Sequence, residues 1–124
     1  MHVFDRTADE TVAWIQEKET VLLSEDYGHD LESIQTLVRK HQGFERDLAA
    51  VREQVEAVVK EAQRLASLFP DAREHVGVKH EETIEAWNEL LEKSALRKDK
   101  LHQAEQLQAY FDEYRELMLV SLLS

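Results

Sequence analysis

The chain has 124 residues, a formal net charge of −11 at neutral pH and no cysteine. This charge disfavours nucleic acid and anionic lipid as partners, and the lack of cysteine excludes disulfides, thiol catalysis and thiolate metal sites. Charged residues make up 33% of the chain, with only three glycines and one proline, which is typical of long helices or coiled coils. Because the N-terminus lacks a signal-peptide pattern and no apolar run is long enough to span a membrane, we expect a soluble, cytoplasmic all-α protein without direct membrane insertion.

The first expected helix precedes a turn at residues 24–30, where Gly28 lies among several turn-forming residues. Its stripe comprises Phe4, Ala8, Thr11, Trp14, Ile15, Lys18, Val21 and Leu22. A stripe wider than the seam between two helices indicates that this helix contacts two partners. We therefore expect three helices to pack together.

The second expected helix begins after Asp30, whose carboxylate can cap the first free amides, and ends before Pro70. Its seam positions, spaced alternately by three and four, are Ile34, Leu37, His41, Phe44, Leu48, Val51, Val55, Val58, Ala62, Leu65 and Phe69. Ten of these eleven positions are apolar, and His41 is the exception. An average spacing of about 3.5 residues over this length predicts a coiled-coil seam.

The third expected helix follows Pro70, where Asp71 and Glu74 have the spacing of a capping box. Its predicted stripe is Ile84, Trp87, Leu91, Ser94 or Ala95, Lys98 and Leu101. No glycine or proline follows Gly77, so the helix can continue to the C-terminus. Short turns favour antiparallel neighbours, and the three helices together predict an antiparallel three-helix bundle.

A rise of about 1.5 Å per residue, counted from each turn, shows which residues of neighbouring helices lie at the same height along the bundle. Trp14 should lie near His41, and Trp87 near residues 51–55 and Phe4. The third helix should draw level with the first turn near residue 108.

The segment beyond residue 108 keeps an apolar stripe of Leu107, Tyr110, Tyr114 and Leu117, which is unfavourable to leave in water. Shifting the chain by 106 residues also places Tyr110 on Phe4. Both observations predict a tandem repeat of about that period. Residues 1–108 would form a complete unit and residues 109–124 the truncated first helix of the following unit.

His41 and the two tryptophans are the candidate functional residues. No histidine has a glutamate three residues before it, as a di-metal bundle would require, so we interpret His41 as a core residue with hydrogen-bond partners. Trp14 and Trp87 could form a ligand surface, but their heptad spacing favours the core. The 26–37 segment lacks the glycine and the final glutamate of a calcium loop, and no loop suits a catalytic nucleophile. We thus expect no catalytic, cofactor-binding or metal residues and no enzyme activity.

The chain resembles the spectrin repeat, a left-handed antiparallel three-helix coiled coil. The resemblance is carried by residues 10–48, ETVAWIQEKETVLLSEDYGHDLESIQTLVRKHQGFERDL, by residues 85–101, EAWNELLEKSALRKDKL, and by residues 103–118, QAEQLQAYFDEYRELM. The family's signature tryptophans match Trp14 and Trp87, and its lysine–histidine pair with a following apolar residue matches Lys40, His41 and Phe44. The turn SEDYGHDL is more similar to α-spectrin than to β-spectrin, dystrophin or α-actinin. Val120 departs from the family, because the next repeat should have its own tryptophan there.

The resemblance implies a structural role at the cell cortex beneath the membrane. The unit would be a spacer and elastic element in a rod that crosslinks actin through other domains of its parent protein. Its partners would be adjacent repeats of the same chain and a lateral spectrin chain. An alternative is a specific binding module whose surface recognises a membrane or adaptor protein, and a further alternative is an enzyme or metal protein built on a helical bundle.

Overall fold

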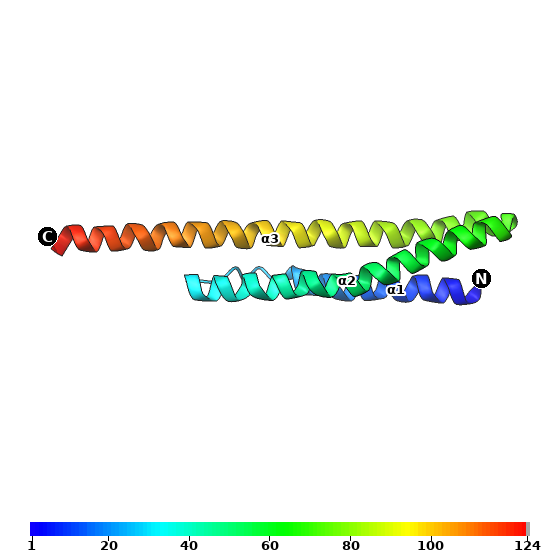
Figure 1. Cartoon of the computed structure of the whole chain (residues 1–124), viewed down its shortest axis with the longest axis horizontal. Helices are drawn as coiled ribbons and strands as arrows, with labels where there is room; N and C mark the ends of the chain where they lie inside the picture. The colour runs from blue at the N-terminus through cyan, green and yellow to red at the C-terminus, as the bar shows by residue number, and fades with distance from the viewer. Residues whose placement is uncertain (124) are drawn as a thin grey trace.

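A computed structural model describes residues 1–123, which form three long helices. The helices are α1 (His2–Thr20), α2 (Leu31–Leu68) and α3 (Arg73–Leu123). Short 3₁₀ helices follow α1 (η1, Val21–Leu23) and precede α3 (η2, Pro70–Ala72). Successive helices run in opposite directions, so that α1 and α3 are parallel and α2 is antiparallel to both (Figure 1). The predicted antiparallel three-helix bundle is therefore confirmed.

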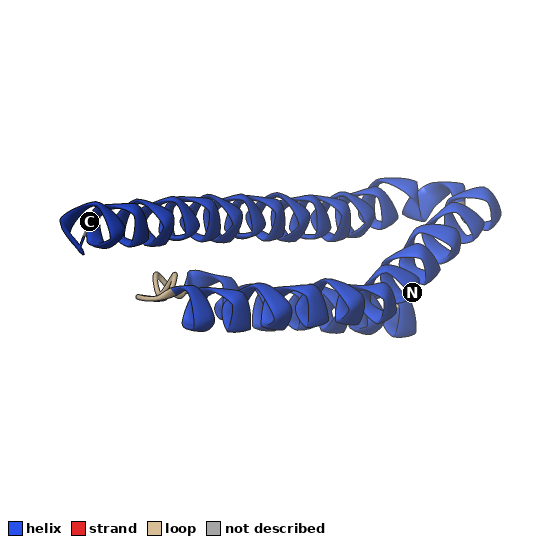
Figure 2. Ribbon diagram, turned by 60° about the vertical axis from the view of Figure 1, so that its left-hand side comes forward, coloured by secondary structure: helices blue, strands red, loops and turns tan. Residues whose placement is uncertain are grey.

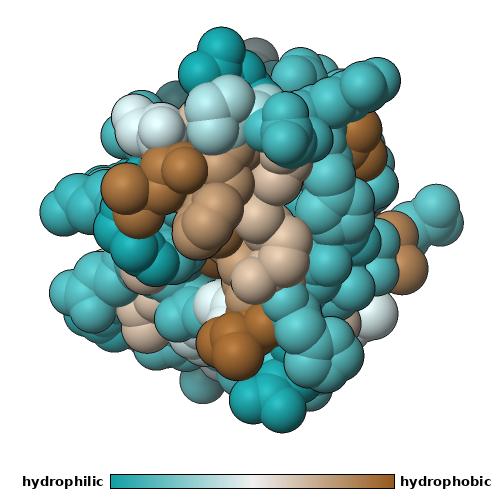
Figure 3. Space-filling view, turned by 90° about the vertical axis from the view of Figure 1, so that its right-hand side faces the viewer, coloured by the Kyte–Doolittle hydropathy of each residue, from teal (hydrophilic) through white to brown (hydrophobic). Residues whose placement is uncertain are grey.

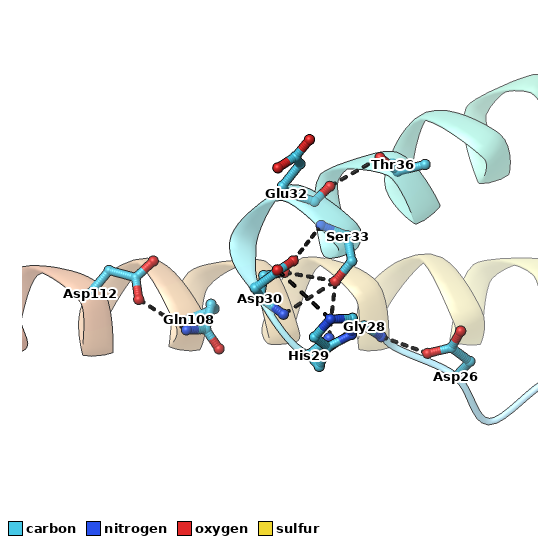
Figure 4. A network of polar contacts seen from close by, with 9 residues as sticks. All are labelled: Asp26, Gly28, His29, Asp30, Glu32, Ser33, Thr36, Gln108 and Asp112. Atoms are coloured by element: carbon cyan, nitrogen blue, oxygen red, sulfur yellow. Dashed lines mark hydrogen bonds and ion pairs between the residues drawn. The ribbon is translucent and has the colours of Figure 1, made fainter.

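The turn before α2 is held by a reciprocal cap. Asp30 Oδ1 accepts a hydrogen bond from the Ser33 amide at 2.7 Å, and Ser33 Oγ accepts from the Asp30 amide at 3.2 Å (Figure 4). This satisfies amides that the first turn of a helix leaves free. Gly28 has a φ of 86°, and a Cβ there would lie 2.6 Å from Ile34 Cγ1. The predicted cap at Asp30 is confirmed, and the turn requires a glycine at position 28.

The second turn differs from the sequence-based expectation. Pro70 begins η2, and Asp71 lies inside this 3₁₀ helix. The cap position expected at Asp71 is therefore wrong. Proline has no amide to satisfy and a φ suited to a first helical turn, so it begins the turn that leads directly into α3.

The core follows the predicted seam of α2 closely. Nine of its eleven positions are buried, Leu37 is half-buried and Phe69 is 52% exposed. Phe69 lies outside because α2 ends at Leu68 and the backbone leaves the helical conformation at the next residue. Two clusters of buried apolar side chains result. The central cluster contains Ile15, Phe44, Leu48, Val51, Val55, Trp87 and Leu90. The cluster towards the α2–α3 turn contains Phe4, Ala8, Val58, Ala62, Leu65 and Val76.

The register of α3 was predicted only in part. Trp87, Ser94 and Leu101 are buried as expected, whereas Lys98 is exposed. Leu90 and Thr83, which were not predicted, are both 0% exposed, and their neighbours Leu91 and Ile84 are only half-buried. Because α3 packs against α1 and α2 together, its innermost residues face the line between the two partners. The predicted stripe assumed that α3 contacts a single partner helix. At two positions it therefore named the residue next to the buried one.

The two ends of the module differ. At one end α3 continues straight past the turn between α1 and α2 (Figure 2). At the other end, apolar atoms gather in the middle of the face that carries the α2–α3 turn (Figure 3). Val3, Leu68 and Phe69 are each more than half exposed there. Within residues 1–123 no helix has the length and apolar character to cross a bilayer.

Candidate functional site

His41 lies in the core and has polar partners. The residue is 5% exposed, its Nε2 and the Ser94 hydroxyl form a hydrogen bond at 3.4 Å, and its ring stacks on Phe44. Glu45 Oε1 approaches Nε2 to 3.7 Å. Burial, opposed by the Glu45 charge, lowers the pKa of His41 below its ordinary value. The imidazole is therefore a neutral core residue that joins α2 to α3.

The two tryptophans have different environments. Trp87 is 8% exposed and belongs to the central cluster with Val51 and Val55, as the level counting predicted. Trp14 is half-buried and packs against the same cluster. The expected proximity of Trp87 to Phe4 is wrong, since Phe4 lies in the other cluster. Both indoles thus contribute packing area.

Two ion pairs and one histidine–carboxylate hydrogen bond connect α1 to α3 along the bundle. His75 Nε2 lies 2.8 Å from Asp5, Lys79 Nζ lies 2.9 Å from Asp9, and Lys93 Nζ lies 3.3 Å from Glu19. The hydrogen bond from Asp9 raises the pKa of Lys79. Exposed pairs of this kind add little net stability, so these contacts mainly fix the alignment of α1 and α3. Sequence reasoning missed them because their partners are some 70 residues apart in the chain.

The α1–α2 loop is fastened to α3 by Arg97. Its Nη1 donates to the Ser24 carbonyl at 2.7 Å and its Nη2 donates to the Asp26 carbonyl at 3.2 Å. The guanidinium also lies 5.4 Å from the centre of the Tyr27 ring, in the range of a cation–π interaction. The sequence contained no signal for this contact. It holds the loop against the rod.

The projecting part of α3 carries exposed apolar side chains. Every residue from 113 to 123 is exposed, and Leu107, Tyr110, Tyr114 and Leu117 are each more than half exposed. At about 100° per residue, Leu107 lies some 120° around the helix from the buried Leu101, and Tyr110 lies about 180° from it. The stripe beyond the bundle thus faces a different side from the core of the bundle.

Two features of the described residues concern metal sites and buried polar groups. Among residues 1–123 no three histidine, aspartate or glutamate side chains gather as a metal-binding group. In the same part of the chain, every buried side-chain nitrogen and oxygen has a hydrogen-bond partner. A capped, closed helical bundle that continues into a projecting helix is the architecture of a helical repeat module.

The sequence model of the spectrin repeat matches residues 1–103, and the chain belongs to this family. It is 38% identical to the human spectrin beta chain, non-erythrocytic 5, over 91% of this chain and 3% of that protein. It is 33% identical to the mouse spectrin alpha chain, erythrocytic 1, over 94% of this chain and 5% of that protein. The similarity to the family's structural, cytoskeletal chains supports a structural repeat.

Two further facts follow from these relatives. The chain spans only 3 to 5% of the length of the spectrin chains named above. Both β-type and α-type chains are among them, so the closer similarity to α-spectrin expected from the turn stays a prediction.

Proposed function

We propose that this chain is a spacer and elastic unit of a spectrin-type rod, with residues 1–108 as one complete repeat and residues 109–124 as the start of the next. The observation that carries the proposal is the unbroken α3. The same helix supplies the buried Trp87, Leu90 and Leu101 and then the exposed stripe beyond them. A helix that belongs to two bundles transmits its direction from one to the other, because a sharp kink in it would interrupt the ladder of backbone hydrogen bonds.

The exposed stripe supports a second bundle rather than a free end. Burying a leucine or tyrosine side chain is worth about 1.5–3 kcal/mol, so several such residues in water are a substantial cost. Two helices of a following unit would cover them, as α1 and α2 cover the earlier part of α3. Because the stripe is rotated by about 120–180° relative to Leu101, the following unit would lie on another side of the shared helix. Successive units would then wind around the rod axis.

Elasticity would come from unfolding of individual units. In a tandem-repeat rod each unit contacts only its neighbours along the chain, so one unit can open while the shared helix beyond it persists. Through other domains of its parent protein the rod would crosslink actin at the cell cortex, and a second spectrin chain would lie alongside it. In this proposal the chain has no enzymatic role.

The test compares this chain with a longer one that contains the complete following repeat of its parent protein. We expect the longer chain to raise the midpoint of urea unfolding of the first unit and to slow amide hydrogen exchange in residues 109–123. A shared helix predicts both changes, because the exposed stripe becomes covered. Unchanged midpoint and unchanged exchange would show that the units are independent and would contradict the proposal.

A specific binding module remains a second candidate function. It is favoured by the exposed apolar residues at the α2–α3 end, including Val3 and Phe69. In that case purified membrane or adaptor partners would lose affinity when Phe69 is replaced by serine. If the following repeat stabilises the first unit and the Phe69 substitution leaves partner affinity unchanged, the spacer function is favoured.

A further inference from the structure

The α1–α2 loop, residues 24–30, presents an aromatic side chain, Tyr27, beside α3. The loop is drawn in tan in Figure 2, at the end of the bundle where α3 continues past it. Its residues belong to no helix or strand, and all except Tyr27 and Gly28 are exposed. The backbone at Ser24 is extended, with φ −63° and ψ 132°, and Gly28 turns the chain at a φ of 86° directly after the tyrosine. Tyr27 therefore lies in a stretch of backbone that no helical hydrogen bonds hold.

Two cations of α3 lie against the ring of Tyr27. Arg97 Cζ is 5.4 Å and Lys100 Nζ is 5.9 Å from the centre of the ring. Because the two residues are three positions apart on a helix, they share one face of α3. Arg97 also donates hydrogen bonds to the carbonyls of Ser24 and Asp26. A negative group attached to this ring would meet two positive charges that the fold already holds beside it.

The sequence before Tyr27 is acidic, since Glu25 and Asp26 precede it directly. Protein kinases use such charge patterns around the acceptor residue to select their substrates. Tyr114 has two acidic residues at the same positions, but it lies inside α3. A kinase draws the residues on both sides of the acceptor into its cleft, which an exposed loop allows at low cost and a helix allows only when its backbone hydrogen bonds break. The fold thus distinguishes two tyrosines that have the same local sequence pattern.

We propose that Tyr27 is a phosphorylation site for a protein tyrosine kinase, and that Arg97 and Lys100 hold the attached phosphate against α3. In the reaction, MgATP supplies the phosphoryl group. The bond between its terminal phosphorus and ADP breaks, a bond from that phosphorus to the Tyr27 hydroxyl oxygen forms, and ADP and the phenolic proton leave. The proposal rests on the proposed function in one respect, because a cytoskeletal chain is exposed to MgATP and kinases.

Phosphorylation would fasten the α1–α2 loop more firmly to α3. The phosphate carries a charge of about −1.5 to −2 at neutral pH, and its oxygens accept strong hydrogen bonds from arginine and lysine. Glu25 and Asp26 repel it, but both are exposed and their charges are screened by water. Arg97 and Lys100 already contact the ring that carries the phosphate. The attraction therefore outweighs the repulsion, and the loop opens less often.

The first experiment treats the whole chain with MgATP and a purified tyrosine kinase that prefers acidic residues before its acceptor. Peptide mass spectrometry gives the rate of modification at each tyrosine. We expect Y27F to lower total incorporation by about tenfold, and Y114F, the matched control, to leave it within about twofold, because helical tyrosines are poor acceptors. Phenylalanine keeps the ring of residue 27 beside its two cations. Incorporation that Y27F leaves unchanged, or equal rates at Tyr27 and Tyr114, would overturn the proposal.

The second experiment measures amide hydrogen exchange in residues 24–30 of the phosphorylated chain. We expect exchange to be about fivefold slower than in the unmodified chain, because the phosphate closes the loop on α3. K100Q should lose most of this slowing, whereas K60Q, which removes an exposed cation of α2, should keep it. Equal slowing in both variants, or faster exchange after phosphorylation, would overturn the position assigned to the phosphate. Neither experiment involves the following repeat, so each can fail while the shared-helix result stands.

Discussion

Replacing Leu90 by alanine tests the register of α3, which is the point where the structure departs most from the sequence pattern. Leu90 is 0% exposed and lies in the central cluster, whereas the adjacent Leu91 is half-buried at the edge of that cluster. Removing a fully buried leucine side chain loses its transfer free energy and leaves a cavity, together about 3–4 kcal/mol. For Leu91 the loss should be about 1–2 kcal/mol, because part of its surface is already in water.

Urea unfolding followed by circular dichroism gives the free energy of unfolding of each variant. Leu96 provides the control, since it lies on the same helix and is 53% exposed. Its replacement by alanine should change the stability by less than about 0.5 kcal/mol. If L91A were as destabilising as L90A, or more so, the sequence-based stripe would be right and the described packing of α3 wrong.

Three other measurements follow from the structure. Since the folded pKa of His41 lies below its ordinary 6.5, the stability that its neutral form contributes is complete above that value and is lost as the pH falls through the folded pKa. Wild-type protein should therefore lose stability on acidification relative to H41L, and parallel pH profiles in urea unfolding would contradict this. G28A should cost about 2 kcal/mol because of the positive φ at this position and the close Ile34 side chain. By contrast, G77A should stabilise the protein by up to about 1 kcal/mol, because a Cβ at this helical position meets no atom within 4 Å. Thermal unfolding that shifts both variants in the same direction would refute the reasoning. R97Q should cost about 1–2 kcal/mol and increase proteolysis of the α1–α2 loop, because two hydrogen bonds to loop carbonyls and the contact with Tyr27 are lost; cleavage as slow as in wild type would contradict it.

The helices and their direction could be read from local patterns. The spacing of apolar residues between Ile34 and Leu65 is a property of one helix, and it repeats often enough to define which face is buried. The cap at Asp30 depends on Ser33, three residues later, so it too is local. For the same reason the unusual His41 could be assigned to the core before its partners were known. A regular seam and few turn signals are sufficient to predict an antiparallel bundle.

Contacts between helices distant in the chain could not be read in this way. The choice between Leu90 and Leu91 depends on where α1 and α2 lie around α3, and both residues fit an apolar stripe. Ser94 became the partner of His41, and Arg97 the anchor of the loop, because the packed bundle brings these groups within hydrogen-bond distance. The periodic sequence thus specifies which residues are inside each helix. The rotation of one helix about its axis against two others, which sets the partners, is a balance of all three interfaces and emerges only on packing.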